Sequence, residues 1–265
     1  MKCKFFVTIL LTFVFATRLS AGNEFCSIRN TSFSAGEKIT LKVYYSVIGL
    51  HVDAGTATFS TSLENYNGKT VYHSVGEGWS NSSYDWIFKV RDRYESYYDT
   101  ATLKPYRFIR NIDEGGYKKH ENASFNHETK TIVTNNKVVK SKECVQDVIS
   151  AVYYARNIDF DSYKPNDKIY LDLYLDDELH QMYVRYMGKE TIKTRYGKFK
   201  AIKFKPLLIK GTMFEGGEKM TVWVSDDGNR LPLRIESEIV VGSVKVDMMG
   251  YRNLRYPLTS MIKFR

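Results

Sequence analysis

Hydrophobic and polar residues alternate along most of the chain, in short runs separated by turn-forming residues. The run at 39–47 shows the pattern clearly, because Ile39, Leu41 and Val43 alternate with Thr40 and Lys42. Successive side chains of a β-strand point to opposite faces, so this spacing predicts a strand with one buried face. Comparable runs recur at regular spacing as far as residue 249. Many short strands with turn signals between them predict an all-β sheet or barrel.

The remaining predicted strands share this alternation and end at Gly, Asn, Asp or Pro. They cover residues 56–62, 69–75, 84–90, 94–99, 105–112, 117–125, 131–133, 137–139, 168–175, 181–188, 189–194, 199–205, 219–224, 231–240 and 243–249. Between two of them, the residues Asp226-Asp-Gly-Asn-Arg230 are typical of a hairpin turn, and their spacing does not match a calcium loop. The stretch Gly76-Glu-Gly-Trp-Ser80 is interpreted as a turn after a strand.

One segment follows a helical period instead. Apolar residues fall at Val145, Val148, Ile149, Val152 and Tyr153, which is one face of a helix. A hydroxyl residue commonly caps the N-terminus of a helix, and Ser141 precedes this run as the expected N-cap. The sequence therefore predicts one short helix near 145–156, packed by its apolar face on a strongly curved antiparallel sheet or open barrel.

The first 22 residues differ from the rest of the chain. Lys2 and Lys4 precede an apolar run from Phe5 to Ala16, and Ser20-Ala-Gly22 supplies small residues for cleavage. This order is typical of a secretory signal peptide, and the run is shorter than the ~20 apolar residues of a membrane span. We expect a signal peptide at 1–22 and a single β-rich domain at 23–265. No later run is long enough to predict a transmembrane span in the mature chain.

The charge of the chain is moderately basic, at +9 for the full sequence. Removing residues 1–22 leaves 36 basic against 30 acidic residues, a net charge of +6. The basic residues are scattered among the predicted strands, whereas nucleic-acid binding requires a basic stripe or patch. No nucleic-acid partner is therefore predicted. Attraction to an anionic surface of the cell envelope stays open as an alternative.

Two cysteines follow the predicted signal peptide, Cys26 and Cys144. In an oxidising compartment two thiols of one exported chain form a candidate disulfide. The alternative is that they are two separate buried thiols, which are common in proteins. The sequence leaves both open.

Motifs for catalysis and metal binding are absent from the sequence. It contains no HExxH zinc motif and no GxSxG nucleophile elbow, and neither of the cysteines that follow the signal peptide has a His nearby in sequence. We therefore assign no catalytic residue, no metal site and no cofactor, and whether the protein is an enzyme stays open, with the sequence favouring a non-enzymatic one.

Aromatic residues are concentrated between residues 79 and 98. Trp79, Trp86, Tyr94 and Tyr98 in this window are candidate ligand-binding residues, because aromatic rings offer large amphipathic surfaces to lipids and sugars. The alternative is that they pair across strands and fill the core of the sheet.

Three motifs resemble a known family. They are Asp147-Val-Ile-Ser-Ala-Val-Tyr-Tyr-Ala-Arg156, Gly216-Gly-Glu-Lys-Met-Thr-Val-Trp-Val-Ser-Asp-Asp-Gly-Asn-Arg-Leu-Pro232 with Val241-Gly-Ser243, and Pro105 with Arg107 and Glu114-Gly-Gly116. The chain resembles the DUF3108 family of exported bacterial proteins over about residues 33–250. The resemblance implies a strongly curved antiparallel sheet, with no established activity and no catalytic residues. The hairpin at 223–232 is also similar to one in the half-barrel lipoprotein carriers of the periplasm.

Together these observations predict a non-enzymatic exported protein, located in the periplasm of a Gram-negative bacterium. Its expected function is to bind a lipid, glycan or peptide of the cell envelope on the concave face of the sheet. The alternatives are a structural or protein-interaction module of the envelope and a hydrolase of envelope polymers.

Overall fold

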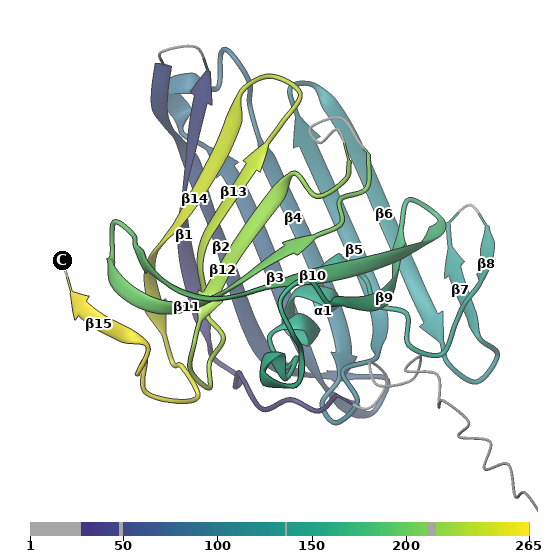
Figure 1. The fold of residues 1–265 in the computed structure, drawn as a ribbon. Helices are drawn as coiled ribbons and strands as arrows, with labels where there is room; N and C mark the ends of the chain where they lie inside the picture. The colour runs from purple at the N-terminus through teal and green to yellow at the C-terminus, as the bar shows by residue number, and fades with distance from the viewer. Residues whose placement is uncertain (1–27, 48–49, 136, 211–215, 265) are drawn as a thin grey trace, which may run out of the picture.

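The computed structural model describes residues 28–47, 50–135, 137–210 and 216–264. The predicted signal peptide at 1–22 and Cys26 lie outside the described residues. The fifteen strands of the described chain belong to one antiparallel sheet, in the order β8-β7-β6-β5-β4-β3-β2-β1-β14-β13-β12-β11-β10-β9, with β15 paired to β11. The sheet curls around a short helix, α1, but its first and last strands do not pair (Figure 1). The predicted all-β fold with an open curved sheet and one short helix is confirmed.

The elements have the following bounds. The strands are β1 (Lys38–Val47), β2 (Leu50–Tyr66), β3 (Lys69–Ser80), β4 (Arg91–Asp99), β5 (Pro105–Glu114), β6 (Tyr117–Asn126), β7 (Thr131–Thr134), β8 (Val138–Lys140), β9 (Lys168–Leu175), β10 (Glu178–Lys193), β11 (Gly197–Pro206), β12 (Met220–Ser225), β13 (Pro232–Glu238), β14 (Ser243–Arg252) and β15 (Met261–Phe264). The helix is α1 (Val148–Ala155), and two 3₁₀ turns are η2 (Ser82–Tyr84) and η3 (Phe160–Ser162).

Helix α1 begins later than the sequence suggested. Its N-cap is Asp147, whose carboxylate accepts the backbone N–H groups of Ile149 and Ser150, and the expected cap Ser141 lies outside the helix. The reason is the residue before the cap: Gln146 is held extended, because its N–H bonds the carbonyl of Asp172 and its carbonyl accepts the N–H of Tyr174. A residue paired to the edge strand β9 cannot also be helical, so the helix starts directly after it.

Three clusters of buried side chains form the core. The first packs α1 against the strands β4–β7 and β9, the second lies around β1, β11, β13 and β14, and the third joins the segment after α1 to β9–β12. Phe59 touches both the first and the second cluster. The buried interior is therefore nearly continuous along the curved sheet.

Some predicted elements differ from those of the structure. Residues 84–90 are not a strand, because Asn81 caps the 3₁₀ turn η2 and the N–H groups of Ile87 and Phe88 bond back to Tyr84. Residues 76–80 are not a turn, because they continue β3 in register with β2 and β4. The predicted strands 181–188 and 189–194 are one strand, β10, whose pairing with β11 shifts register between Tyr186 and Gly188. The short C-terminal strand β15 was not predicted.

Candidate functional site

The four aromatic residues proposed for ligand binding do not form one wall. In the β3–β4 ladder Tyr94 is paired with Gly76, so these two residues share a face of the sheet. Trp79 lies three residues after Gly76 on β3 and therefore points to the opposite face. Tyr98 shares the concave face with Tyr94. Trp86 lies in the β3–β4 loop, where 82% of its surface is exposed.

The concave face beside Tyr98 is filled by helix α1. Tyr98 is fully buried, its hydroxyl forms a 2.6 Å hydrogen bond with that of Ser74, and its ring lies 6.1 Å from that of Tyr153 on the helix. At Gly76 a Cβ atom would come 2.9 Å from Cδ1 of Ile149. Gly76 thus lets the helix approach β3 closely, as a glycine does where packed elements need room. This part of the concave face is packed core.

A buried carboxylate fixes the helix to the sheet. The hydroxyl of Ser96 on β4 donates a 2.5 Å hydrogen bond to Oδ2 of Asp147, while Oδ1 caps the helix. Burial raises the pKa of Asp147 to about 6, although the hydrogen bonds from Ser96 and Ser150 oppose that shift. Desolvation of this carboxylate therefore outweighs its local hydrogen bonds.

Charged side chains join the two ends of the curled sheet on the concave side. Nη2 of Arg110 on β5 lies 2.6 Å from Oε2 of Glu121 on β6, and both side chains are almost fully buried. Asp176, in the β9–β10 turn, contacts both Arg110 and Lys119. Side-chain ion pairs therefore connect β5 and β6 to the β9–β10 turn, although no backbone ladder joins β5 or β6 to β9.

The carboxylates on and around β4 have different surroundings in the structure. Burial and then the neighbouring Asp92 raise the pKa of Glu114 to about 7 on the concave side. Glu95 instead bonds His73 and Arg93 on the other face, and Asp99 caps the turn after β4. Among the described residues, no three His, Cys, Asp or Glu side chains lie together as a group that could hold a metal ion.

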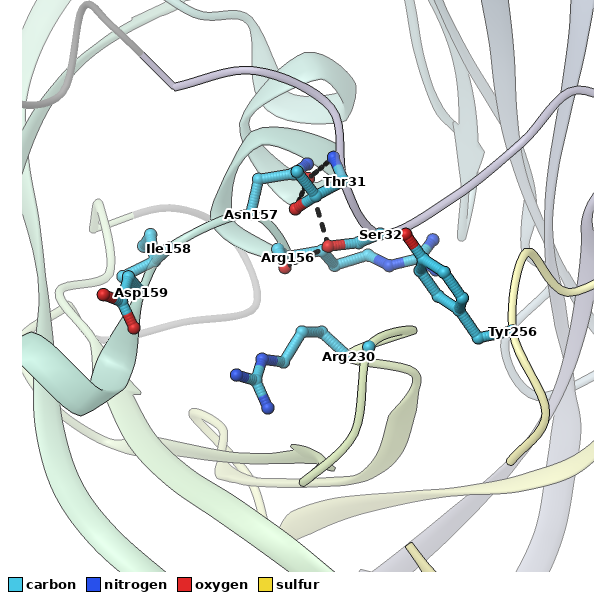
Figure 2. Close-up of a pocket in the computed structure, with 9 residues that line it drawn as sticks. Thr31, Ser32, Arg156, Asn157, Ile158, Asp159, Arg230 and Tyr256 are labelled. Carbon is cyan, nitrogen blue, oxygen red and sulfur yellow. Dashed lines mark hydrogen bonds between the residues drawn. The ribbon is translucent and has the colours of Figure 1, made fainter. Parts of the chain in front are cut away.

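A cavity of about 270 Å³ lies at the end of the molecule where α1 ends (Figure 2). Its lining includes Arg156, Asn157, Arg230 and Tyr256. Arg156 is fixed by a two-point ion pair with Glu37, in which Nη1 lies 2.5 Å from Oε1 and Nη2 lies 2.9 Å from Oε2.

The rest of this cavity is also built from paired groups. Nε and Nη2 of Arg156 donate to the backbone carbonyl of Asn229. The side-chain NH₂ of Asn229 donates to the backbone carbonyl of Tyr256, and its side-chain oxygen accepts the backbone N–H of Tyr256. The carboxylate of Asp227 accepts from Ser225, Asn229 and Ser260. The segment 226–230 is thus a hairpin turn, as predicted, and its role is to anchor the end of α1 and the C-terminal segment. The two arginines of the cavity are already paired, Arg156 with Glu37 and Arg230 with Asp226 at 3.3 Å, so the cavity offers an incoming anion little.

A second cavity, of about 290 Å³, lies around Trp79. Lys42, Thr56, Asn81 and Arg91 line it with polar groups. The two basic residues are already paired, Lys42 with Asp53 at 2.7 Å and Arg91 with Asp85 at 2.6 Å. Both cavities fall slightly below the ≈300–1,000 Å³ of typical small-molecule sites.

Exposed apolar side chains gather at the turns of one end of the sheet. We name two groups: the aromatic tip consists of Trp86, Ile87, Phe88 and Tyr117, and the aliphatic tip consists of Leu50, Val240 and Val241. Between 47% and 82% of each side chain is exposed. Isolated exposed apolar residues are ordinary, whereas contiguous ones mark interaction surfaces.

The fold and these surfaces define a class of protein in which one curved antiparallel sheet wraps a short helix. The model of a family described as "protein of unknown function (DUF3108)" matches residues 39–249. The chain belongs to the DUF3108 family, as its motifs suggested.

One solved structure has a similar fold, and a second is a weaker match. A β-barrel-like protein of the domain of unknown function DUF1849 from Brucella abortus is 8% identical, with a TM-score of 0.56, over 85% of this chain and 99% of that one. A protein from Bacteroides fragilis, described as exported with a YmcC-like fold, is 12% identical with a TM-score of 0.34, over 86% of this chain and 100% of that one. Among curated proteins, none matches the chain. Within the described residues, no helix is long and apolar enough to cross a membrane.

Sequence reasoning missed the partner of Arg156 and the exposed tips. Glu37 lies just before the first strand, and nothing in its local pattern marks it as a buried ion-pair partner of a helix residue. The run Trp86-Ile-Phe88 was missed because a hydrophobic stretch normally predicts burial. The Asn81-Ser82-Ser83 sequence, which favours a capped turn, was the available signal against a strand.

Proposed function

We propose that this protein is an exported, non-enzymatic protein of the bacterial envelope, which acts as an interaction module through its outer surface. The observation that carries the proposal is the packed part of the concave face, where α1, Tyr98 and Phe108 belong to one buried cluster. The exposed apolar tips supply a surface for contact instead. The signal-like segment at 1–22 and the oxidising compartment that it implies support export.

Photo-crosslinking in the native host tests this function. A photoreactive amino acid is placed at Ile87 in the aromatic tip, and in a matched variant at Leu63, which is comparably exposed but lies outside the tips. We expect a discrete covalent adduct from Ile87 and none from Leu63. Equal labelling at both positions, or no adduct at either, would contradict a surface-directed interaction.

A polar ligand on the concave face is the second candidate function, and one observation favours it. Nε of Arg110 is buried without a hydrogen-bond partner among the described residues, although Nη2 pairs with Glu121. Tyr94, Asp92 and Glu114 lie on the same side, and burial followed by the charge of Asp92 raises the pKa of Tyr94 to about 12. A small polar molecule held there would complete the hydrogen bonds of Arg110.

A further inference from the structure

The two tips lie at the same end of the sheet because of its connectivity. The neighbouring antiparallel strands β13, β14, β1, β2, β3, β4, β5 and β6 run alternately up and down. The β13–β14, β3–β4 and β5–β6 connections and the adjoining ends of β1 and β2 must therefore lie at one edge, at the top of Figure 1. The hydroxyl of Tyr45 donates to the carbonyl of Val241 at 2.9 Å, which ties the β13–β14 turn to β1.

The aromatic tip is locally ordered. A Cβ atom at Gly115 would come within 2.3 Å of the Phe88 ring, and the Gly115 N–H donates to the carbonyl of Lys89 at 2.8 Å. The β3–β4 loop therefore rests on the β5–β6 turn. The indole Nε1 of Trp86 donates to the carbonyl of Ser83 at 3.0 Å. Because this donor is already bonded, the indole ring can leave water without an unsatisfied N–H.

The opposite ends of the same strands are different. Their connections are 67–68, 100–104, 127–130, 226–231 and 253–260, and of the exposed large hydrophobic residues of the described chain only Tyr256, 40% exposed, lies in them. Leu103 and Leu231 in these connections are fully buried. Exposed apolar turn residues are thus concentrated at the end of the molecule that carries the tips.

Charge at the aromatic tip favours an anionic partner. The side chain of Lys118 is 76% exposed and that of Lys89 is 49% exposed, whereas the nearby Asp113 and Asp85 are each 25% exposed. Asp113 is shared by Lys89 at 3.6 Å and Lys118 at 4.0 Å, so two ammonium groups face one carboxylate, and Asp85 is paired with Arg91. The exposed charges next to the Trp and Tyr rings are therefore positive in excess. Aromatic rings beside lysines are the usual arrangement at a membrane–water interface.

We propose that the aromatic and aliphatic tips dock this end of the sheet onto the surface of a lipid bilayer that contains anionic headgroups. The tips belong to several different turns of the sheet, and a deformable bilayer accommodates several turns more readily than a rigid protein surface does. The side chains enter the interface, and Lys89 and Lys118 remain at the level of the headgroups. This proposal rests on the proposed function, because it names the partner of the interaction surface.

Vesicle co-sedimentation of the mature chain tests the docking. The vesicles are phosphatidylcholine alone or an equal mixture with phosphatidylglycerol, at low and physiological salt. The tip variant carries Trp86→Ala, Ile87→Ala and Phe88→Ala. The control variant carries Leu63→Ala, Ile262→Ala and Phe264→Ala, three comparably exposed residues outside the tips. Circular dichroism and thermal unfolding establish that both variants are folded.

The wild-type chain is expected to bind the mixed vesicles and to release with added salt. The tip variant should bind at least about tenfold more weakly, since three large apolar contacts are lost, and the control should bind as the wild type does. Lys89→Gln with Lys118→Gln should weaken binding to the mixed vesicles only. Failure of the wild type to bind, or equal loss in tip and control variants, overturns the proposal. If Ile87 crosslinks to a protein and no vesicle binding occurs, the interaction module stands and the bilayer as its partner is wrong.

Discussion

Arg156, at the C-terminus of α1, and Glu37, just before β1, form a buried two-point ion pair although 119 residues separate them in the chain. The guanidinium also donates to the carbonyl of Asn229 and lies 5.5 Å from the centres of the Phe33 and Tyr153 rings. Three distant segments are thereby joined at the end of the helix. The pair fixes where α1 sits, and hence how it fills the concave face.

Removing one partner of this pair is expected to destabilise the fold strongly. Arg156→Met leaves the Glu37 carboxylate buried without its counter-ion, which typically costs about 3–5 kcal/mol of unfolding free energy. Urea denaturation measures this loss. The double variant Arg156→Met with Glu37→Leu should recover much of it, because no uncompensated charge remains. As a control, Glu238→Gln breaks the ion pair between Glu238, 69% exposed, and Lys219, 46% exposed. This variant should leave the urea midpoint of unfolding unchanged. Similar losses for both single variants would contradict this account.

The buried cap Asp147 should make stability depend on pH in a defined direction. Burial raises its pKa from 3.8 to about 6, so the folded state binds the proton more tightly than the unfolded state. The contribution of Asp147 to the free energy of unfolding is fully present below about pH 4. It falls by about 3 kcal/mol in total as the pH rises through the folded-state pKa of about 6. Asp147→Asn retains a capping oxygen and does not titrate. The wild type should therefore lose stability relative to this variant between pH 4 and pH 7, and a constant difference over that range would show that the shift is absent.

Two glycines on β3 provide a matched test of helix packing. Gly76→Ala would place a methyl group 2.9 Å from Ile149 and 3.2 Å from Phe59, and such overpacking typically costs about 1–3 kcal/mol. Gly78→Ala meets nothing within 4 Å and should be neutral or slightly stabilising. Thermal unfolding distinguishes the two variants. Adding Ile149→Val to Gly76→Ala should restore part of the loss, and no recovery would place the strain elsewhere.

Cys144 is disulfide-bonded in the structure, while Cys26 lies outside the described residues. The pairing of these two cysteines stays a prediction. It would close a loop of more than 100 residues, which the chain-entropy model relates to roughly 4–5 kcal/mol of stability. The mature protein should then contain no free thiol under denaturing, non-reducing conditions. Two titratable thiols would rule the bond out.

Local patterns in the sequence were enough to predict most of the strands and the existence of the helix, because both depend on residue spacing. The hairpin at 226–230 and the apolar face of α1 are examples. The start of the helix was not predictable in this way, since Gln146 is held by β9, a strand that follows it in sequence. The same is true of β15, whose partner β11 lies more than 50 residues away.

The candidate site was harder to predict because it depends on which face of the sheet a residue occupies. Aromatic density alone grouped Trp79 with Tyr94, and only the β3–β4 register separates them. The sequence placed Trp86 in a strand at 84–90. In the structure the capped 3₁₀ turn η2 precedes it, so Trp86 lies in an exposed loop instead. Glu37 gave no local signal, because its burial results from long-range packing.

Native mass spectrometry of the protein purified from its own host tests the central claim most directly. If the concave face is filled and the protein acts through its surface, the measured mass is that of the mature chain alone. Tyr94→Phe, which alters the polar group around Arg110, should likewise give the mass of its own chain alone. A retained small molecule, released by gentle activation and lost in Tyr94→Phe, would contradict the account and favour a ligand on the concave face.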